Sequence, residues 1–191
     1  MKVFKLISVL LLVVVLSSCK EVKKEQPVTG NVIEKAIQAP AKKEHGIVTK
    51  ESFVDVKTTM DRLEKIISKK KEIQLFNRIN HAENSKNSGA KDVADSELII
   101  FGNPKVGLKM TAKDPKSGLD LPLKVLAYQA KDGKVYVSYR AVSFLSEIYE
   151  LGECEAQGKM NKSINKITDI ITKAPEDFKK FMEAAKAKKG K

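Results

Sequence analysis

The run Leu98-Ile99-Ile100-Phe101 and the residues directly after it constrain the fold more than any other stretch of this chain. A short, unbroken apolar run is typical of a buried strand. Gly102 ends the run, Asn103 is a good helix cap, and Pro104 suits the first helical position. The stretch therefore predicts a buried strand that passes directly into a helix.

Further elements are predicted on both sides of this junction. Ile73, Leu75, Asn77 and Ile79 alternate as a strand, with Phe76 on its other face. The remaining predicted strands are 53–57, 121–129 and 135–139, with a turn at 132–133. Helices are predicted from Thr58 or Thr59 to 71, from 104 to about 114, over 144–151 and over 160–171. The polar stretch 81–95 is read as a loop, and the residues after 175 as a short lysine-rich helix or a frayed tail.

This order of elements indicates an α+β domain. It predicts a mainly antiparallel sheet of about five strands with helices packed on one face, in the order strand, helix, strands, helix, hairpin, helices. The order of the strands within the sheet does not follow from the sequence.

The N-terminus has the pattern of an export signal. Lys2 and Lys5 precede an apolar run from 6 to 16 that is too short to span a hydrocarbon core of about 30 Å. The run ends in Leu16-Ser17-Ser18-Cys19, which matches the bacterial lipobox. We therefore predict a signal peptide over 1–18 and a Cys19 that carries lipid. The alternatives are an uncleaved anchor, or an ordinary secretory signal whose cysteine is accidental.

Composition divides the rest of the chain. Residues 19–50 are predicted to be the lipidated cysteine and a flexible tether, 51–173 a single α+β domain, and 174–191 a lysine-rich tail. Residues 51–156 carry 17 basic and 16 acidic side chains, so the net charge of +12 lies mostly in the flanking segments. This distribution argues against nucleic-acid binding, which concentrates basic residues on a folded face. It fits either a membrane surface near a lipid anchor or simple solvation of the tether and tail.

The predicted location is the bacterial cell envelope, with the protein held in the membrane by its N-terminal lipid and facing the periplasm or the exterior. Lys20 after the lipidated cysteine favours the outer membrane if the cell is Gram-negative. Cys154 would then be the one free thiol, which is interpreted as buried and inert, intermolecularly bridged, or reactive. No metal site or cofactor is predicted, because the chain has neither zinc-site spacing nor a haem attachment motif.

Three stretches together resemble the bacterial family called domain of unknown function 302. They are Arg78-Ile79 followed by Asn80-His81-Ala82; 98–105 with Gly107; and 118–126 leading into 132–135 and Ser138-Tyr139. The resemblance runs from about 52 to about 172. It implies a compact α+β domain and a homodimer, but no established reaction. Arg140-Ala141-Val142 departs from the acidic residue and proline that family members often have there, which puts the cap of the next helix in doubt.

Polar residues at the predicted strand ends are the candidates for ligand binding or catalysis: His81, Asn103, Lys105, Asp120 and Lys124. Each also has a structural explanation: His81 in a loop hydrogen bond, Asn103 as a helix cap, Asp120 in the turn at Gly118 and Lys124 as a solvated strand residue. Lys105 or Lys124 could hold an anion.

Three functions remain open from the sequence. The preferred one is a homodimeric binding module for a small or anionic ligand at the envelope. An acid–base enzyme would use His81 with Asp120 oriented toward it, since such a pair is the minimum for proton transfer. A structural or stress-response interaction protein would have no small-molecule site.

Overall fold

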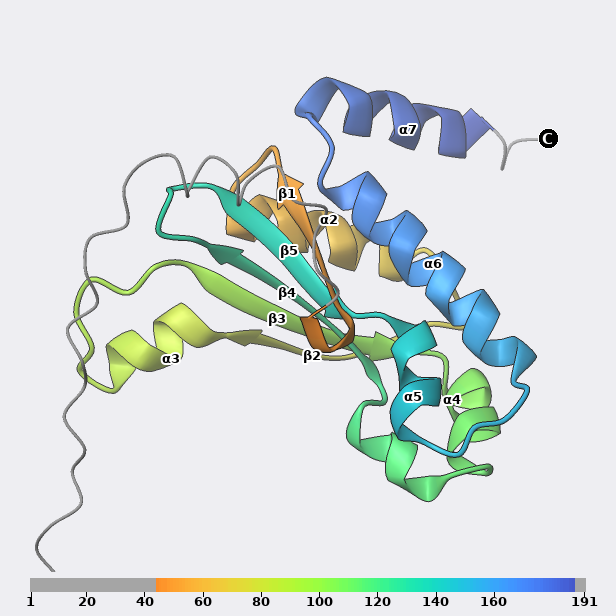
Figure 1. Ribbon diagram of the computed structural model, residues 1–191. Coiled ribbons are helices and arrows are strands. Elements are labelled where there is room, and N and C mark those ends of the chain that lie inside the picture. The colour runs from red at the N-terminus through yellow and green to blue at the C-terminus, as the bar shows by residue number, and fades with distance from the viewer. Residues whose placement is uncertain (1–43, 188–191) are drawn as a thin grey trace, which may run out of the picture. The chain divides into compact units, whose positions relative to one another are not determined.

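The computed structural model describes residues 44–187. Its centre is a five-stranded antiparallel sheet with the strand order β1-β5-β4-β3-β2 (Figure 1). The strands are β1 (Ile47–Ser52), β2 (Gln74–Asn80), β3 (Ser96–Gly102), β4 (Leu123–Gln129) and β5 (Val135–Arg140). The main helices are α2 (Val56–Ile67), α3 (His81–Asn87), α4 (Pro104–Thr111), α6 (Glu155–Ile171) and α7 (Pro175–Ala187). The predicted α+β class is confirmed.

The core lies between the sheet and the helices α2 and α6. Alternate strand residues such as Ile99, Val125 and Val137 are fully buried on this side. Met60 of α2 and Ile164 of α6 pack against them in the same cluster. Burial of one such side chain stabilises the fold by about 1.5–3 kcal/mol. The apolar residues at helical spacing in α6 are the ones that pack against the sheet, which explains the predicted pattern.

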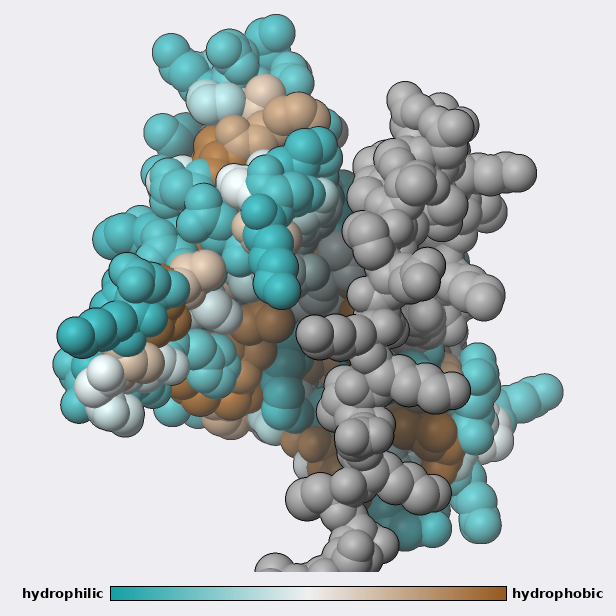
Figure 2. Space-filling view, turned by 60° about the vertical axis from the view of Figure 1, so that its left-hand side comes forward, coloured by the Kyte–Doolittle hydropathy of each residue, from teal (hydrophilic) through white to brown (hydrophobic). Residues whose placement is uncertain are grey.

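Within residues 44–187, the other face of the sheet carries no helix layer comparable to α2 and α6. Leu98, Ile100 and Leu126 alternate with the core residues and are half-buried there. Figure 2 turns the side of the sheet opposite α6 toward the reader, and hydrophobic residues lie among hydrophilic ones on it. This surface, called the open face below, also carries the tilted ring pair Tyr128 and Tyr136, whose centroids are 6.0 Å apart.

The predicted junction of strand and helix is confirmed. β3 ends at Gly102, and the Asn103 side chain accepts the backbone N–H of Lys105 at 3.0 Å. Pro104 occupies the first turn of α4. The cap satisfies backbone donors that a helix start otherwise leaves unpaired.

The beginning of the domain differs from the prediction. The first strand is β1 at Ile47–Ser52, which pairs with β5, rather than 53–57. The folded part therefore begins before the predicted boundary at 51. Asp55, not Thr58 or Thr59, caps α2, because its side chain accepts the Thr58 backbone N–H at 2.7 Å.

The polar stretch after β2 contains a helix that its apolar pattern does not reveal. Asn80 caps α3 by accepting the Glu83 backbone N–H at 2.9 Å. Ala82 is buried, whereas most of the other residues of α3 face solvent. The prediction of a loop over 81–95 is wrong for 81–87, because this helix is fixed by its cap rather than by an apolar stripe.

The segments after β5 also depart from the prediction. A single helix over 144–151 is replaced by the short helices η3 (Val142–Phe144) and α5 (Leu145–Ile148). Ala141 provides no side-chain cap, and Asn161 of α6 instead accepts the Val142 backbone N–H at 3.1 Å. Cys19 and the other predictions for residues 1–43 lie outside the described residues.

Candidate ligand-binding site

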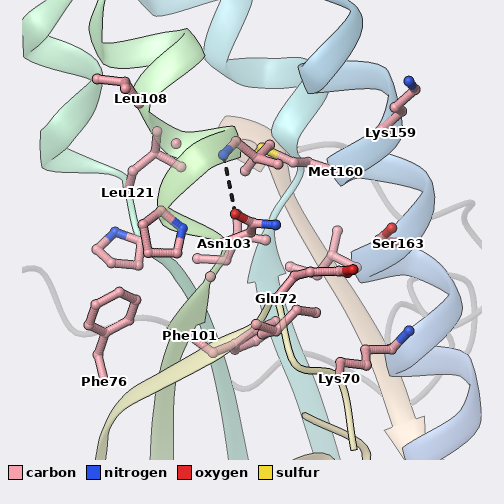
Figure 3. Close-up of a pocket in the computed structure, with 18 of the residues that line it drawn as sticks. Lys70, Glu72, Phe76, Phe101, Asn103, Leu108, Leu121, Lys159, Met160 and Ser163 are labelled. Atoms are coloured by element: carbon pink, nitrogen blue, oxygen red, sulfur yellow. Dashed lines mark hydrogen bonds between the residues drawn. The ribbon is translucent and has the colours of Figure 1, made fainter.

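A pocket of about 530 Å³ lies between α4, α6 and the adjacent ends of β2 and β3 (Figure 3). Its walls are mainly apolar and come from segments far apart in the chain. The apolar lining includes Phe101, Val106, Leu121, Leu123, Ile164 and Ile167. The volume is in the range of pockets that bind small molecules, which are usually apolar with a few polar groups.

Asn103 places the one side-chain amide of this pocket in its wall. Its Oδ1 accepts the backbone N–H of Lys105 and, at 3.4 Å, that of Val106, which fixes the oxygen toward α4. The Nδ2 group then points into the pocket (Figure 3) and has no hydrogen-bond partner within residues 44–187. Because an amide nitrogen only donates, the pocket offers a donor to an acceptor atom of a ligand.

A bulge in β2 shapes the side of the pocket opposite α6. Leu75 pairs with Phe101 on the core side, but Asn77 pairs with Ile100 on the open face, so Phe76 is the extra residue. The predicted simple alternation of this strand is therefore wrong. Phe76 is 44% exposed and lines the pocket instead of standing on one face of the sheet.

Polar residues gather on the α6 side of the pocket. Lys70, Glu72, Lys159 and Ser163 line it there (Figure 3). Lys159 pairs with Glu155 at 2.6 Å, and its hydrogen bond lowers the pKa of that carboxyl. Lys70 makes no ion pair among the described residues and is exposed. The pocket is thus amphipathic, with an apolar side toward Phe76 and two lysines and one carboxylate, Glu72, toward α6.

Asp120 and Lys124 lie together in a second, smaller hollow of about 240 Å³ at the open face. Arg140 pairs with Asp120 at 3.1 Å, and the Tyr149 hydroxyl donates to Asp120 at 2.7 Å. This hydrogen bond favours the protonated phenol and raises the pKa of Tyr149. The carboxylate is therefore already satisfied by side chains of its own chain.

The five predicted residues do not converge. His81 follows Asn80, which pairs with Glu97 at one end of β3, whereas Leu123 pairs with Phe101 at the other end. These levels are about 13 Å apart at ~3.3 Å per strand residue. Asp120 pairs with Arg140 of β5, which is three strands from β2. Within one chain, the structure therefore does not bring His81 and Asp120 together as a proton-transfer pair, and their catalytic role stays a prediction.

The other candidates are dispersed. Lys105 is exposed on the solvent side of α4, and Cys154 is half-buried where α6 begins. Within residues 44–187 no group of three or more His, Cys, Asp or Glu side chains could hold a metal ion. The lining residues Phe76, Gly107 and Met160 were not predicted. Met160 has the helical spacing of a buried face, Phe76 was placed on one face of a strand, and Gly107 belongs to a motif of the family resemblance, but none of these patterns indicates a pocket.

Known proteins are similar in sequence to part of this chain. Curated relatives include the fluoride-specific ion channels FluC 1 of Brucella suis and FluC 1 of Brucella abortus, both 34% identical over 107 residues. The match covers 56% of this chain and 41% or 39% of those proteins, so the chain spans about two fifths of their length. In the part of this chain that the structure describes, no helix is long and apolar enough to cross a membrane.

A solved structure has a similar fold. It is the crystal structure of an uncharacterized conserved protein from Bacillus stearothermophilus, with a TM-score of 0.57 and 15% identity. The structural match covers 67% of this chain and 98% of the Bacillus stearothermophilus chain. The family model for the domain of unknown function DUF302 matches residues 48–167, most of the described sheet and helices. The chain therefore belongs to the DUF302 family, as its sequence motifs indicated.

Proposed function

We propose that this protein is an envelope-anchored lipoprotein whose domain binds a small amphiphilic anion, such as a medium-chain carboxylate, and acts as a homodimer. The observation behind the proposal is the apolar pocket beside α4, with Lys70 in its lining and with the Asn103 Nδ2 group in its wall, which has no hydrogen-bond partner within residues 44–187. The apolar walls suit an alkyl chain, and the donor and cation suit a carboxylate, since Lys70 and Lys159 outnumber Glu72, the one acidic residue of the lining. Lys2, the apolar run and Cys19 in the sequence support the proposed lipid anchor.

Asn103 allows the ligand role to be separated from the role as a helix cap. Asn103→Asp retains an oxygen that caps α4, but it removes the donor and adds a negative charge to the pocket. Asn80→Asp is the matched control, because Asn80 caps α3 in the same way and does not line the pocket. Only the first change is expected to weaken binding of an anion.

Gly107 allows the pocket to be filled without disturbing the core. A Cβ at Gly107 meets no atom within 4 Å, and the residue lines the pocket. Gly158 of α6 has equally open space but lies outside the pocket. Gly107→Phe is expected to block the pocket, whereas Gly158→Phe should leave it open.

The test is calorimetric titration of dodecanoate into a chain that begins at Lys20, which includes the complete described unit with its own core. Asn103→Asp and Gly107→Phe should each reduce affinity at least about tenfold, equivalent to ~1.4 kcal/mol. Their thermal stabilities should stay close to those of the two controls. Equal affinities for all five proteins, or no binding to the parent chain, would reject the proposal.

A further inference from the structure

Two of the large hydrophobic side chains that are most exposed in the described residues belong to the segments that form one wall of the pocket. Leu119 is 79% exposed and Leu108 is 66% exposed. They belong to η2 (Pro115–Leu119) and α4, which contact each other and lie together at one end of the sheet (Figure 1). Isolated exposed leucines need no explanation, but a pair beside an apolar pocket does.

The same two segments are basic on their exposed side. Lys105 and Leu108 are three residues apart on α4, so they share a helical face, and Lys109 follows. Lys116 is exposed in η2 close to Leu119. The one acidic residue between 104 and 119, Asp114, is buried, where the backbone N–H groups of Lys116 and Glu150 bind it. The exposed Lys116 ammonium also lies 3.6 Å from this carboxylate, so Lys105 and Lys109 carry most of the positive charge of these segments.

The carboxylates nearby belong to another segment. Glu147, Glu150 and Glu153 lie on α5 and the loop after it, and all are exposed. The positive charge is therefore specific to the side formed by α4 and η2. We call the residues Lys105, Leu108, Lys109, Lys116 and Leu119 the basic tip.

We infer that the basic tip docks on an anionic lipid surface, with its leucines in the headgroup region and its lysines on the headgroups. Lysine stems lie along apolar surface while their ammonium groups reach polar groups, and apolar side chains flanked by lysine are typical of interfacial segments. The pocket opens beside the tip, since Leu108 and Gly118 also line it. An amphiphile could then pass from the lipid into the pocket without crossing bulk water. This last step rests on the proposed function, whereas the docking itself does not.

Leu119, Lys105 and Lys116 do not line the pocket, so variants at these positions test docking alone. Leu119→Ser removes the more exposed leucine. Phe53→Ser is the matched control, because Phe53 is 70% exposed but belongs to another part of the fold. It follows β1, and its backbone N–H donates to the Thr172 carbonyl after α6. The double variant Lys105→Gln/Lys116→Gln removes charge without shortening the side chains greatly.

The experiment is co-sedimentation of the chain from Lys20 with vesicles of phosphatidylcholine that contain phosphatidylglycerol, and with vesicles of phosphatidylcholine alone. We expect binding to the anionic vesicles that weakens roughly tenfold for Leu119→Ser and for the lysine double variant, and that weakens with added salt. Phe53→Ser should bind the vesicles like the parent chain. All docking variants should still bind dodecanoate in vesicle-free buffer.

Several outcomes would overturn the inference. They are no binding to anionic vesicles, equal binding to both kinds of vesicle, or an equal loss for Phe53→Ser and Leu119→Ser. A chain that ignores vesicles but binds dodecanoate would reject docking and leave the proposed function standing. A chain that binds vesicles but not dodecanoate would reject the proposed function and leave the docking inference standing.

Discussion

At the scale of a single residue, Asp55 shows how a helix cap makes stability depend on pH. The backbone N–H of Thr58 donates to its carboxylate and lowers the pKa of Asp55 below its ordinary value of 3.8. A lowered pKa in the folded state means that the stabilisation is complete above 3.8 and is lost as the pH falls through the lower folded value. Asp55→Asn keeps an acceptor for the cap but has no charge.

Near pH 7 we expect the free energy of unfolding of Asp55→Asn to be about 0.5 kcal/mol lower than that of the parent chain, and this difference should disappear near pH 2. Urea denaturation at several pH values measures it. Asp95→Asn is the control, because the Asp95 side chain accepts no hydrogen bond within residues 44–187. A difference for Asp55→Asn that stays constant with pH would show that the charge has no part in the cap.

At the scale of elements, Arg78 connects α2 to the sheet. Its guanidinium contacts Asp61 at 2.7 Å and Glu64 at 3.0 Å on α2, and Glu97 at 2.6 Å on β3. Glu97 is only 7% exposed. Arg78→Met should destabilise the fold by ~3 kcal/mol, because it leaves a buried carboxylate without its partner.

Adding Glu97→Gln to Arg78→Met should recover part of that loss, since the uncompensated charge is then gone. Lys57→Met is the control: Lys57 pairs with Asp61 at the surface, where such pairs contribute about 0–1 kcal/mol. Urea denaturation of the four proteins checks this. If Glu97→Gln worsened the Arg78 variant, the buried charge would not be the cause.

The elements that were predicted correctly are those whose local signals and tertiary contacts agree. β3 and α6 have an apolar pattern that matches the faces they bury, and Asn103 before Pro104 is a local signal for the start of α4. β1 and α3 were missed because neither has such a pattern: β1 is an edge strand with alternate residues exposed, and α3 is mostly polar. The bulge at Phe76 depends on pairing with β3, which no local pattern encodes.

The same reasoning explains why only Asn103 of the predicted residues lies in the pocket. Polar residues were correctly recognised at the ends of strands. Adjacent strands are antiparallel, however, so the C-terminal ends of two successive strands lie at opposite ends of the sheet along the strand direction. His81 and Asn103 are separated for this reason. The pocket itself consists of side chains that the sequence indicates only as core, because α6 buries part of its apolar face and leaves the rest beside α4.

At the scale of the whole molecule, the open face provides the test of the proposed homodimer. Leu98, Ile100 and Leu126 are adjacent on β3 and β4, where Leu98 pairs directly with Leu126. A second copy placed face to face would bury these side chains, whereas in one copy they remain partly exposed to solvent. Leu126→Lys would place a charge in the middle of that surface.

We expect the parent chain from Lys20 to have the mass of a dimer by light scattering during gel filtration, and Leu126→Lys to have the mass of a monomer. The interfacial charge would have to be desolvated without a partner, which weakens association by several kcal/mol, or roughly a hundredfold or more. Phe53→Lys is the control, since Phe53 is 70% exposed but follows β1, where its backbone N–H donates to the Thr172 carbonyl directly after α6, on the core side of the sheet. A monomeric parent chain would contradict the proposed dimer, and a dimer unaffected by Leu126→Lys would place its interface elsewhere, for example at the exposed edge strand β2.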